Sequence, residues 1–353
     1  MTLFSSPAFE DHEAVHAFHD AAAGLSCLIA IHSTARGPAS GGVRMWPYPD
    51  DQAAIDDALR LSRAMSYKNA MAGIDFGGGK TVIIGDSRTD KTPAMFEALG
   101  RAVESLGGRY WGAEDVGISP TDLAWARTTT RYMAGLEGHP AASGDPSPVT
   151  AEGVRRGIAL CVARALGKPL SEVTVAIQGV GHVGAVLAGK LAADGARLVV
   201  CDYNAAAAAE VAARTGARVV APEAIFDTGA EVFAPCALGG AISAATLPRL
   251  TAKVIAGGAN NQLADPAAGQ ALYDAGVLYA PDFVINGGGI INVAAEIGAL
   301  QRGEPYDPAW VESKLTAMIA TLSDVLDRSA AADTPADQIA VAMAKEKIAA
   351  AKR

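Results

Sequence analysis

The chain has little of what proteins that bind nucleic acids or membranes carry. Its 353 residues have a formal net charge of −9 and a pI near 5.2, whereas binding to phosphate backbones or anionic lipids needs basic patches. No apolar run approaches the ~20 residues that span a bilayer. Residues 1–20 also lack a basic segment followed by an apolar core. We therefore expect no nucleic-acid partner, no membrane association and no signal peptide.

Cysteine is also scarce, and its pattern excludes two uses. The four cysteines, Cys27, Cys161, Cys201 and Cys236, lie far apart in apolar surroundings. They match neither a metal-binding pattern nor a disulfide framework. We expect buried, reduced thiols, as in a cytoplasmic protein.

Three of the six histidines fall near the start of the chain. Residues 1–24 look helical and amphipathic, which would put His12, His16 and His19 near one helix face. A metal site would need a carboxylate or thiol partner at ligand spacing, and none is evident. We interpret the histidines as part of a polar helix face and expect no metal.

Length and apolar content favour two α/β domains. Half of the residues are hydrophobic, which is enough for sizeable cores, and 353 residues favour two domains. Residues 134–148 are rich in Gly, Pro and Ser and make the best boundary. Strand-like and helical stretches alternate on both sides of it, which predicts a helix-flanked sheet in each domain.

The stretch 173–204 has the order strand, tight turn, helix, strand and acid. An apolar run precedes three glycines spaced G-x-G-x-x-G, and an Ala- and Leu-rich segment of helical length follows at 183–193. A second apolar run at 198–201 ends on an aspartate. This order is typical of a Rossmann-type, doubly wound domain that binds a dinucleotide. The alternative is a doubly wound sheet that merely has one glycine-rich turn.

Each residue of this pattern has a physical role at a dinucleotide. Gly179 permits the tight turn, Gly181 lets the backbone approach a pyrophosphate, and Gly184 lets the helix pack against the strand. The helix N-terminus offers N–H groups and a positive dipole end to the phosphates. Asp202 can accept hydrogen bonds from ribose hydroxyls and would repel a 2′-phosphate, and the two residues after it include no Arg. We therefore predict NAD rather than NADP.

Other special residues also follow strand-like runs in the second domain. Cys236 follows a run at 231–234, and Asn260 follows a run at 253–256. Ligands of open α/β sheets bind beyond the carboxyl ends of the strands. We therefore expect these residues near the same ligand.

The first domain contains a lysine in a glycine-rich setting, GGGK at 77–80. A Walker phosphate loop precedes a helix, but here a strand-like run follows, so we set that interpretation aside. Burial in an apolar cleft would lower the pKa of Lys80, and such a lysine can act as a general acid or base. Lys68 would suit an anionic substrate, and Asp115 could relay a proton. A surface ion pair is the alternative for each residue.

Long segments of the chain resemble the glutamate/leucine/phenylalanine/valine dehydrogenase family, and most closely its leucine dehydrogenase branch. The resemblance covers nearly the whole chain. It depends on GPASGGVRMWPY (37–48), DALRLSRAMSYKNAMAGIDFGGGKTVIIGD (57–86), AEDVGIS (113–119), PSPVTAEGV (146–154), QGVGHVG (178–184), FAPCALGG (233–240), VIAGGANNQL (254–263) and YAPDFVINGGGIINVAAE (279–296).

The resemblance implies reversible, NAD-dependent oxidative deamination of an L-amino acid to a 2-oxo acid and ammonia. Lys80 matches the catalytic lysine, and Asp115 matches the acid that exchanges protons with the substrate amine. It further implies a substrate and oligomerisation domain at 1–133, an NAD-binding domain at 134–327, and a C-terminal helical segment, about 328–353, that returns to the first domain. Family members are homo-oligomers, so we expect a dimer or an octamer.

The same resemblance implies two sets of binding residues. Those expected at the substrate are Ser40, Gly41, Gly42, Met65, Lys68, Ala113, Asn261, Ile290 and Val293. Those expected at the cofactor are Thr150, Gly179, Val180, Gly181, His182, Val183, Gly184, Asp202, Tyr203, Asn204, Cys236, Ala237, Asn260 and Asn286.

The substrate's side chain is expected to be hydrophobic. The resemblance places Ser40, Ala113, Ile290 and Val293 around the substrate's side chain, and none of them is a basic residue for a side-chain carboxylate, so glutamate is disfavoured. Leucine-specific relatives carry a leucine where Ser40 stands, so Ser40 enlarges the pocket, whereas Ile290 and Val293 are typical of the leucine branch. One methylene discriminates by only ~1–3 kcal/mol in an apolar pocket. We expect a branched-chain amino acid, with phenylalanine as the alternative.

Two other functions remain open alternatives. A non-catalytic NAD-binding regulator would need to have lost the catalytic residues, yet Lys68, Lys80 and Asp115 are all present. A hydroxy-acid dehydrogenase would need a His–carboxylate pair, and the histidine near the motifs, His182, lies inside the glycine turn.

Overall fold

The computed structural model describes residues 3–351, and they form two compact units. Unit 1 contains the described parts of Met1–Gly144, Ile291–Val311 and Ala344–Arg353. Unit 2 contains Asp145–Ile290 and Glu312–Met343. The two units are defined by which residues of the chain contact one another. The division by function, at 133/134 with a returning segment about 328–353, stays a prediction.

Unit 1 is built on a mixed five-stranded sheet in the order β1-β2-β4-β3-β5. β1 and β2 form an antiparallel hairpin, β2 also pairs antiparallel with β4, and β3 pairs parallel with both β4 and β5. The strands are β1 (Ala14–Asp20), β2 (Leu25–Ser33), β3 (Ala39–Trp46), β4 (Gly77–Ile84) and β5 (Tyr110–Glu114).

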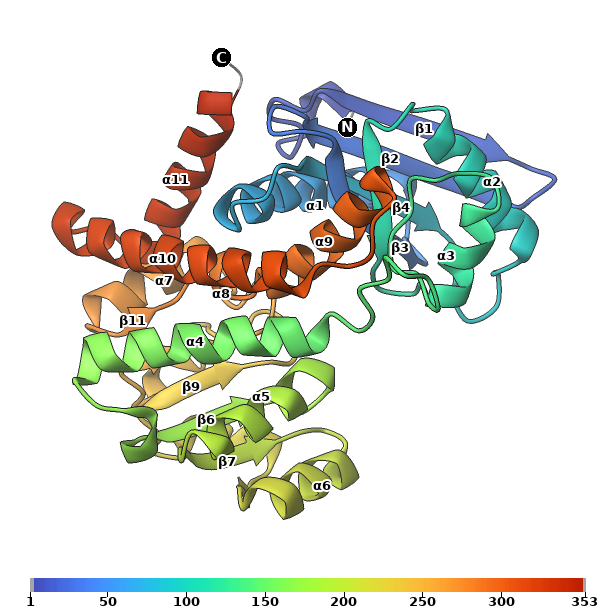
Figure 1. Cartoon of the computed structure of the whole chain (residues 1–353). Helices are drawn as coiled ribbons and strands as arrows, with labels where there is room; N and C mark the ends of the chain where they lie inside the picture. The colour runs from blue at the N-terminus through green and yellow to red at the C-terminus, as the bar shows by residue number, and fades with distance from the viewer. Residues whose placement is uncertain (1–2, 352–353) are drawn as a thin grey trace. The chain divides into compact units, whose positions relative to one another are not determined.

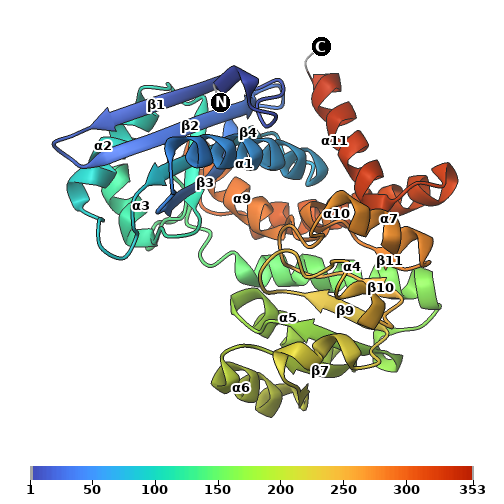
Figure 2. The same cartoon turned by 180° about the vertical axis from the view of Figure 1, so that it is seen from behind.

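Helices cover both faces of this sheet (Figures 1 and 2). Ala54 and Ala58 of α1 (Asp51–Met71) pack on one face against Ala30 and Val82. Residues of α2 (Pro93–Glu104) and α3 (Pro120–Arg127) fill the core on the other face. Each helix begins at a side-chain cap, and α3 has a complete capping box formed by Ser119 and Asp122, which satisfies its first N–H groups.

Unit 2 is a doubly wound domain, which confirms the predicted fold class. Its six strands are all parallel and run in the order β11-β10-β9-β6-β7-β8. From β6 the chain proceeds outward to β8 and then returns to β9, so the strand order reverses between β6 and β9. The strands are β6 (Thr174–Gln178), β7 (Arg197–Cys201), β8 (Arg218–Val219), β9 (Val232–Pro235), β10 (Val254–Ile255) and β11 (Leu278–Tyr279).

Helices connect and follow these strands (Figure 1). They are α4 (Ser147–Leu166), α5 (His182–Ala193), α6 (Ala205–Thr215), α7 (Pro266–Asp274), α8 (Asp282–Ile285), α9 (Gly288–Arg302), α10 (Pro308–Ala332) and α11 (Ala336–Ala351). Short 3₁₀ turns lie at η1 (Leu3–Ser5), η2 (Leu170–Glu172), η3 (Pro222–Asp227) and η4 (Leu247–Arg249). The last three α-helices each have residues in both units.

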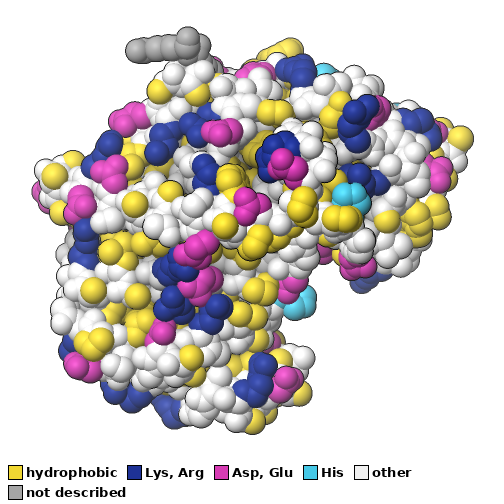
Figure 3. Space-filling model, viewed as in Figure 1, with side chains coloured by type: hydrophobic (Ala, Val, Ile, Leu, Met, Phe, Trp, Pro, Cys, Tyr) yellow, Lys and Arg dark blue, Asp and Glu magenta, His cyan; other side chains and the backbone are white. Residues whose placement is uncertain are grey.

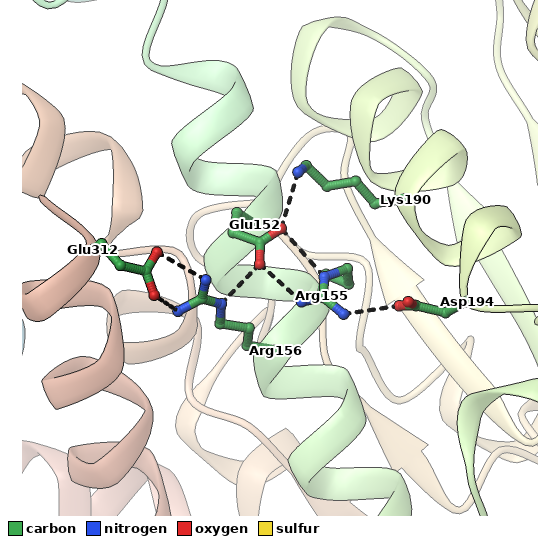
Figure 4. A network of polar contacts seen from close by, with 6 residues as sticks. All are labelled: Glu152, Arg155, Arg156, Lys190, Asp194 and Glu312. Carbon is green, nitrogen blue, oxygen red and sulfur yellow. Dashed lines mark hydrogen bonds and ion pairs between the residues drawn. The ribbon is translucent and has the colours of Figure 1, made fainter. Parts of the chain in front are cut away.

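A charged network ties three helices of unit 2 together (Figure 4). Glu152 of α4 accepts hydrogen bonds from Arg155, Arg156 and Lys190, the last of which lies on α5. Arg156 also forms two hydrogen bonds with Glu312 of α10, at 2.7 and 2.9 Å. Burial would raise the pKa of Glu152, but its three basic partners together lower it to about 2. The network therefore stays charged across the physiological range.

The predicted helix over residues 1–24 is wrong. Seven residues of this stretch form β1, in register with seven residues of β2. His16 and His19 lie on that strand, whereas His12 precedes it and is buried, with Nε2 2.8 Å from the Ser62 hydroxyl of α1. The Ala-rich composition suggests a helix, but pairing with β2 overrides this local preference.

The glycines at 77–79 are typical of a loop, but the structure places them in a strand. They are the first residues of β4, and each lacks room for a side chain. A Cβ on Gly77 would lie 1.9 Å from the Ser33 carbonyl oxygen, and one on Gly78 would lie 2.1 Å from the Ser66 backbone nitrogen. The glycines therefore allow the neighbouring strand and α1 to approach closely.

Charged side chains of both signs lie on the surface of the described residues. Basic and acidic side chains intermingle on the face shown in Figure 3, where they lie side by side over α4. Among the described residues, no helix is long and apolar enough to cross a bilayer. The described part of the chain also holds no cluster of three or more His, Cys, Asp or Glu that could bind a metal.

Candidate active site

Lys80 lies in unit 1, on the face of β4 that α1 covers. The neighbouring residues on that face are Gly78, which abuts Ser66 of α1, and Val82, which packs against α1. Lys80 is only 4% exposed, and its Nζ contacts Oδ2 of Asp115. Asp115 comes directly after β5, so the parallel strands β4 and β5, which flank β3, bring the two side chains together.

The surroundings of this pair lower both pKa values, by burial at Lys80 and by neighbouring cations at Asp115. Burial lowers the pKa of Lys80, and the Asp115 carboxylate only partly opposes this effect. Burial would raise the pKa of Asp115, but the Lys80 and Arg44 cations outweigh it and hold the value below its usual range. Asp115 is therefore ionised at neutral pH, and Lys80 loses its proton more readily than a lysine in water.

Two glycines of β3 make the approach of Lys80 and Asp115 possible. A Cβ on Gly42 would lie 2.6 Å from the Asp115 Cβ and 3.0 Å from the Lys80 Nζ. A Cβ on Gly41 would lie 1.8 Å from the Gly79 carbonyl oxygen. A side chain at Gly42 would push Asp115 and Lys80 apart, and one at Gly41 would push β3 away from β4, so both glycines are steric requirements of this arrangement.

The other expected substrate residues are only partly brought together. Met65 and Lys68 are half-buried and lie one turn apart on α1, and Ala113 is buried in β5. Ser40 is 1% exposed, and its hydroxyl has no hydrogen-bond partner among the described residues. Val293 belongs to unit 1, whereas two further expected substrate residues, Asn261 and Ile290, belong to unit 2. A pocket made of the whole set stays a prediction.

The glycine turn of unit 2 has the local geometry that we predicted. Gly179 directly follows β6 and has φ +92°, a conformation that favours glycine. A Cβ on Gly184 would lie 2.0 Å from the Gly179 carbonyl oxygen, so this position needs close packing. Gly181 is the N-cap of α5, and a Cβ there would meet no atom within 4 Å. Open space thus lies beside the helix N-terminus, where His182 and Val183 form its first turn.

Asp202 closes the turn from the end of β7. Its Oδ2 accepts a hydrogen bond from the Val180 N–H at 2.8 Å, and its Oδ1 accepts one from the Asn204 N–H at 2.8 Å. Each carboxylate oxygen has a second lone pair for another donor. Asn204 also has a structural role that we did not predict from the sequence, because its side chain caps α6. Tyr203 is 88% exposed.

Further expected cofactor residues lie at the carboxyl ends of the neighbouring strands β9 and β10. Cys236 follows β9, and burial raises the pKa of its thiol to about 11, so it is not a reactive thiolate. Ala237 is the nearest residue to a Cβ built on Gly179. Asn286 donates to Oδ1 of Asn260 at 2.9 Å, and its own Oδ1 is buried without a partner among the described residues.

Thr150 lies near the start of α4, also within unit 2. Its hydroxyl donates to the Pro146 carbonyl oxygen at 2.9 Å and lies 2.9 Å from a Cβ built on Gly289. Gly179, Cys236 and Asn286 lie at or beyond the carboxyl ends of parallel strands, and the order of those strands reverses between β6 and β9. That is where open α/β sheets bind their ligands.

One charged group of the site, Arg44, was not predicted from the sequence. Arg44, on β3, is 3.0 Å from Asp115 through Nε and 3.0 Å from Asp57 through Nη1. The signal was present, since Arg44 lies within the motif GPASGGVRMWPY, two residues after Gly42. Alternation along a strand places both residues on the face of Lys80.

The chain is similar to known proteins over most of its length. The Glu/Leu/Phe/Val dehydrogenase dimerisation domain matches residues 12–132, and Glutamate/Leucine/Phenylalanine/Valine dehydrogenase matches residues 200–353. Leucine dehydrogenase of Geobacillus stearothermophilus is 48% identical over 303 residues, which cover 86% of this chain and 83% of that protein. Phenylalanine dehydrogenase of Bacillus thermotolerans is 43% identical over 307 residues, covering 85% and 80%.

A solved structure extends the similarity to three dimensions. The crystal structure of L-tryptophan dehydrogenase from Nostoc punctiforme matches with a TM-score of 0.86 at 37% identity, and the match covers 100% of both chains. Sequence, fold and family models thus agree over most of the chain. This chain belongs to the glutamate/leucine/phenylalanine/valine dehydrogenase family.

Proposed function

We propose that this chain is an NAD-dependent amino-acid dehydrogenase that deaminates a hydrophobic L-amino acid, reversibly, to its 2-oxo acid and ammonia. The observation that carries the proposal is the buried Lys80–Asp115 pair, because a lysine of lowered pKa and an ionised carboxylate beside a glycine backbone suit proton transfer at a small substrate. The relatives named above are dehydrogenases of leucine, phenylalanine and tryptophan.

Unit 2 has residues that fit NAD. The open space at Gly181 and the free N–H groups at the start of α5 suit the pyrophosphate, and Asp202 suits the ribose diol and would repel a 2′-phosphate. Asn286 has a buried oxygen that still lacks a donor among the described residues. When bound, NAD would supply the hydride acceptor for the substrate Cα.

Proton transfer is assigned to unit 1. Hydride can leave Cα only when the substrate amine is neutral, so Asp115 accepts a proton from the substrate ammonium. Lys80 then takes a proton from the water that attacks the imine carbon and later releases it to solvent. Asp115 returns its proton to the amine nitrogen, and it relays the proton of the newly formed hydroxyl to the departing ammonia as the C–N bond breaks and the carbonyl forms. Lys68 pairs with the substrate carboxylate. Substrate, NAD⁺ and water thereby give 2-oxo acid, ammonium, NADH and one proton.

The proposed substrate is a branched-chain amino acid, and phenylalanine is the alternative. Ile290 and Val293 favour a compact aliphatic side chain, whereas a small residue at position 40 favours a larger one. The deep burial of Ser40 supports the first choice, because a 1% exposed side chain leaves little open space beside it. We further propose a homo-oligomer, supported by the dimerisation-domain match over residues 12–132. We also propose a cytoplasmic setting, in which the four unpaired cysteines would stay reduced.

The substrate proposal is tested by initial rates of NADH formation with L-Leu, Val, Ile, Phe, Trp, Met, Ala and Glu. A maximum among Leu, Val and Ile supports the branched-chain proposal. A maximum at Phe replaces it with the alternative. Absence of a rate with every amino acid, while NAD still binds, contradicts the enzymatic proposal and favours a non-catalytic NAD-binding protein.

A further inference from the structure

We propose that Arg44 is a positioning residue, whose guanidinium bridges Asp115 to Asp57 and thereby holds the Asp115 carboxylate against Lys80. This inference rests on the proposed function, because it assigns Asp115 and Lys80 to the proton transfers. The inference adds two supporting residues to the Lys80–Asp115 pair, Arg44 on β3 and Asp57 on α1. Arg44 acts through Asp115 and is not itself assigned a contact with substrate.

The geometry around Asp115 is specific to one oxygen. Oδ2 of Asp115 contacts the Lys80 Nζ, and the same oxygen accepts a hydrogen bond from the Arg44 Nε at 3.0 Å. Two cations on one oxygen fix the rotation of the carboxylate. The second oxygen, Oδ1, can then accept from a substrate amine.

The far side of Arg44 is anchored on α1. Its Nη1 donates to Oδ2 of Asp57 at 3.0 Å, and the Tyr48 hydroxyl donates to the same oxygen at 2.6 Å. Arg60 donates to the other oxygen of Asp57 at 2.6 Å. The Asp57 side chain is 16% exposed and that of Arg44 is 21% exposed. Arg44 is thus held at both ends, in a setting where charge pairs are screened less than at the surface.

Three successive ion pairs link four side chains whose charges alternate in sign: Lys80, Asp115, Arg44 and Asp57. The charged groups that face Asp115 are Lys80 from β4 and Arg44 from β3. Those that influence Lys80 are Asp115, Arg44 and Asp57. Arg44 lowers the pKa of Asp115, since it favours the anion, and it also lowers the pKa of Lys80, since it disfavours a second cation.

The direction in which removal of Arg44 shifts the pH–rate profile follows from these charges. Without Arg44, the pKa of Asp115 and that of Lys80 both rise, so the whole pH–rate profile moves to higher pH. A nearby cation lowers the pKa of a carboxyl group by about one unit or more, and this sets the expected size of the shift in the pH–rate profile. An ion pair that only stabilised the fold would change the amount of folded enzyme and leave the profile in place.

The test compares kcat and KM against pH for wild type, Arg44→Gln, Arg44→Lys and a control, Arg63→Gln. Arg63 lies on α1, has a similarly buried side chain, 27% exposed, and pairs with Glu10, away from Asp115. Arg44→Gln should lower kcat about tenfold or more and move the profile up by about one unit. Arg44→Lys keeps the charge but not the two-pronged bridge, so it should recover the pH profile better than kcat. Arg63→Gln should match wild type.

Two results would overturn the proposal: an unshifted profile in folded Arg44→Gln, or the same losses in Arg63→Gln. A readout without turnover separates this inference from the proposed function. Carboxyl ¹³C NMR of aspartate-labelled protein, with the Asp115 signal assigned by Asp115→Asn, should show a raised Asp115 pKa in Arg44→Gln. If wild type deaminates no amino acid but this pKa rises, the proposed function fails and the positioning by Arg44 stands.

Discussion

At the scale of single residues, the site depends on a lysine that would be costly to bury alone. An unpaired buried ammonium loses its hydration, so it needs a carboxylate partner or gives up its proton. Lys80 has the partner, Asp115, and a lowered pKa as well. The pair can therefore exchange protons with a ligand at a modest free-energy cost, which a fully hydrated lysine could not do near neutral pH.

Lys80→Ala should abolish deamination and leave NADH binding intact. Loss of a general acid–base group costs about 10²-fold or more in kcat. Lys80 contacts Asp115 and belongs to unit 1, whereas the glycine turn belongs to unit 2. Stopped-flow rates and NADH fluorescence titration measure the two effects. The matched control is Lys91→Ala, which removes another half-buried lysine–aspartate pair of unit 1, with Asp122. An equal loss of NADH affinity in Lys80→Ala would show that Lys80 belongs to the cofactor site.

Lys80 and Asp115 could be predicted from the sequence, but their surroundings could not. The motifs contain a lysine after glycines and an acid after a strand, and the structure brings the two into contact. The bridge from Arg44 to Asp57 joins β3 to α1 and depends on how that helix packs on the sheet. Asn204 was predicted only as a cofactor residue, which stays a prediction, although an asparagine before a helix is also a familiar cap signal and its side chain does cap α6.

At the scale of elements, one buried carboxylate fastens a loop of unit 1 to α9. Glu296 is 0% exposed and accepts hydrogen bonds from the N–H groups of Gly135, Leu136 and Ser143 at 2.8–2.9 Å. The Ser143 hydroxyl adds a fourth, at 2.7 Å. A carboxylate only accepts, so it matches four donors.

Glu296→Gln should therefore destabilise unit 1, although the two side chains have nearly the same shape. The amide NH₂ would face N–H donors, which leaves buried groups unsatisfied at a cost of about 1–3 kcal/mol each. Urea unfolding measures the free energy of unfolding. Glu304→Gln, an exposed change near the end of the same helix, should cost no more than about 0.5 kcal/mol. Equal stability of the two variants would contradict this role for Glu296.

Element prediction from sequence failed where tertiary pairing decided the outcome. β1 has an Ala- and His-containing sequence with no strong alternation, and it becomes a strand because β2 offers seven paired residues. The glycines at the start of β4 look like a loop, yet a Cβ added at any of them would lie under 3 Å from a neighbouring atom, so close packing requires them. In both cases the decisive neighbours are remote in sequence.

At the scale of the whole molecule, the doubly wound fold of unit 2 could be predicted because its signal is local. Strand, turn, helix and acid follow one another within 32 residues, from Val173 to Asn204. Unit 1 gathers three separate stretches of the chain, and α9, α10 and α11 each contribute to both units. The division of these helices between the two units depends on contacts between residues far apart in the sequence. The periodicity of apolar residues along the sequence does not encode such contacts. The proposed reaction needs both units, because unit 1 carries the acid–base pair and unit 2 the cofactor residues.

The most direct measurement for the central claim is NADH oxidation with 4-methyl-2-oxopentanoate, the 2-oxo acid of leucine, with and without ammonium. An amino-acid dehydrogenase should oxidise NADH only when both are present, with a rate that saturates in ammonium and forms L-leucine. Oxidation that proceeds equally without ammonium would identify a hydroxy-acid dehydrogenase and contradict the account. No oxidation under either condition, with any of the 2-oxo acids matching the amino-acid panel, would contradict it as well.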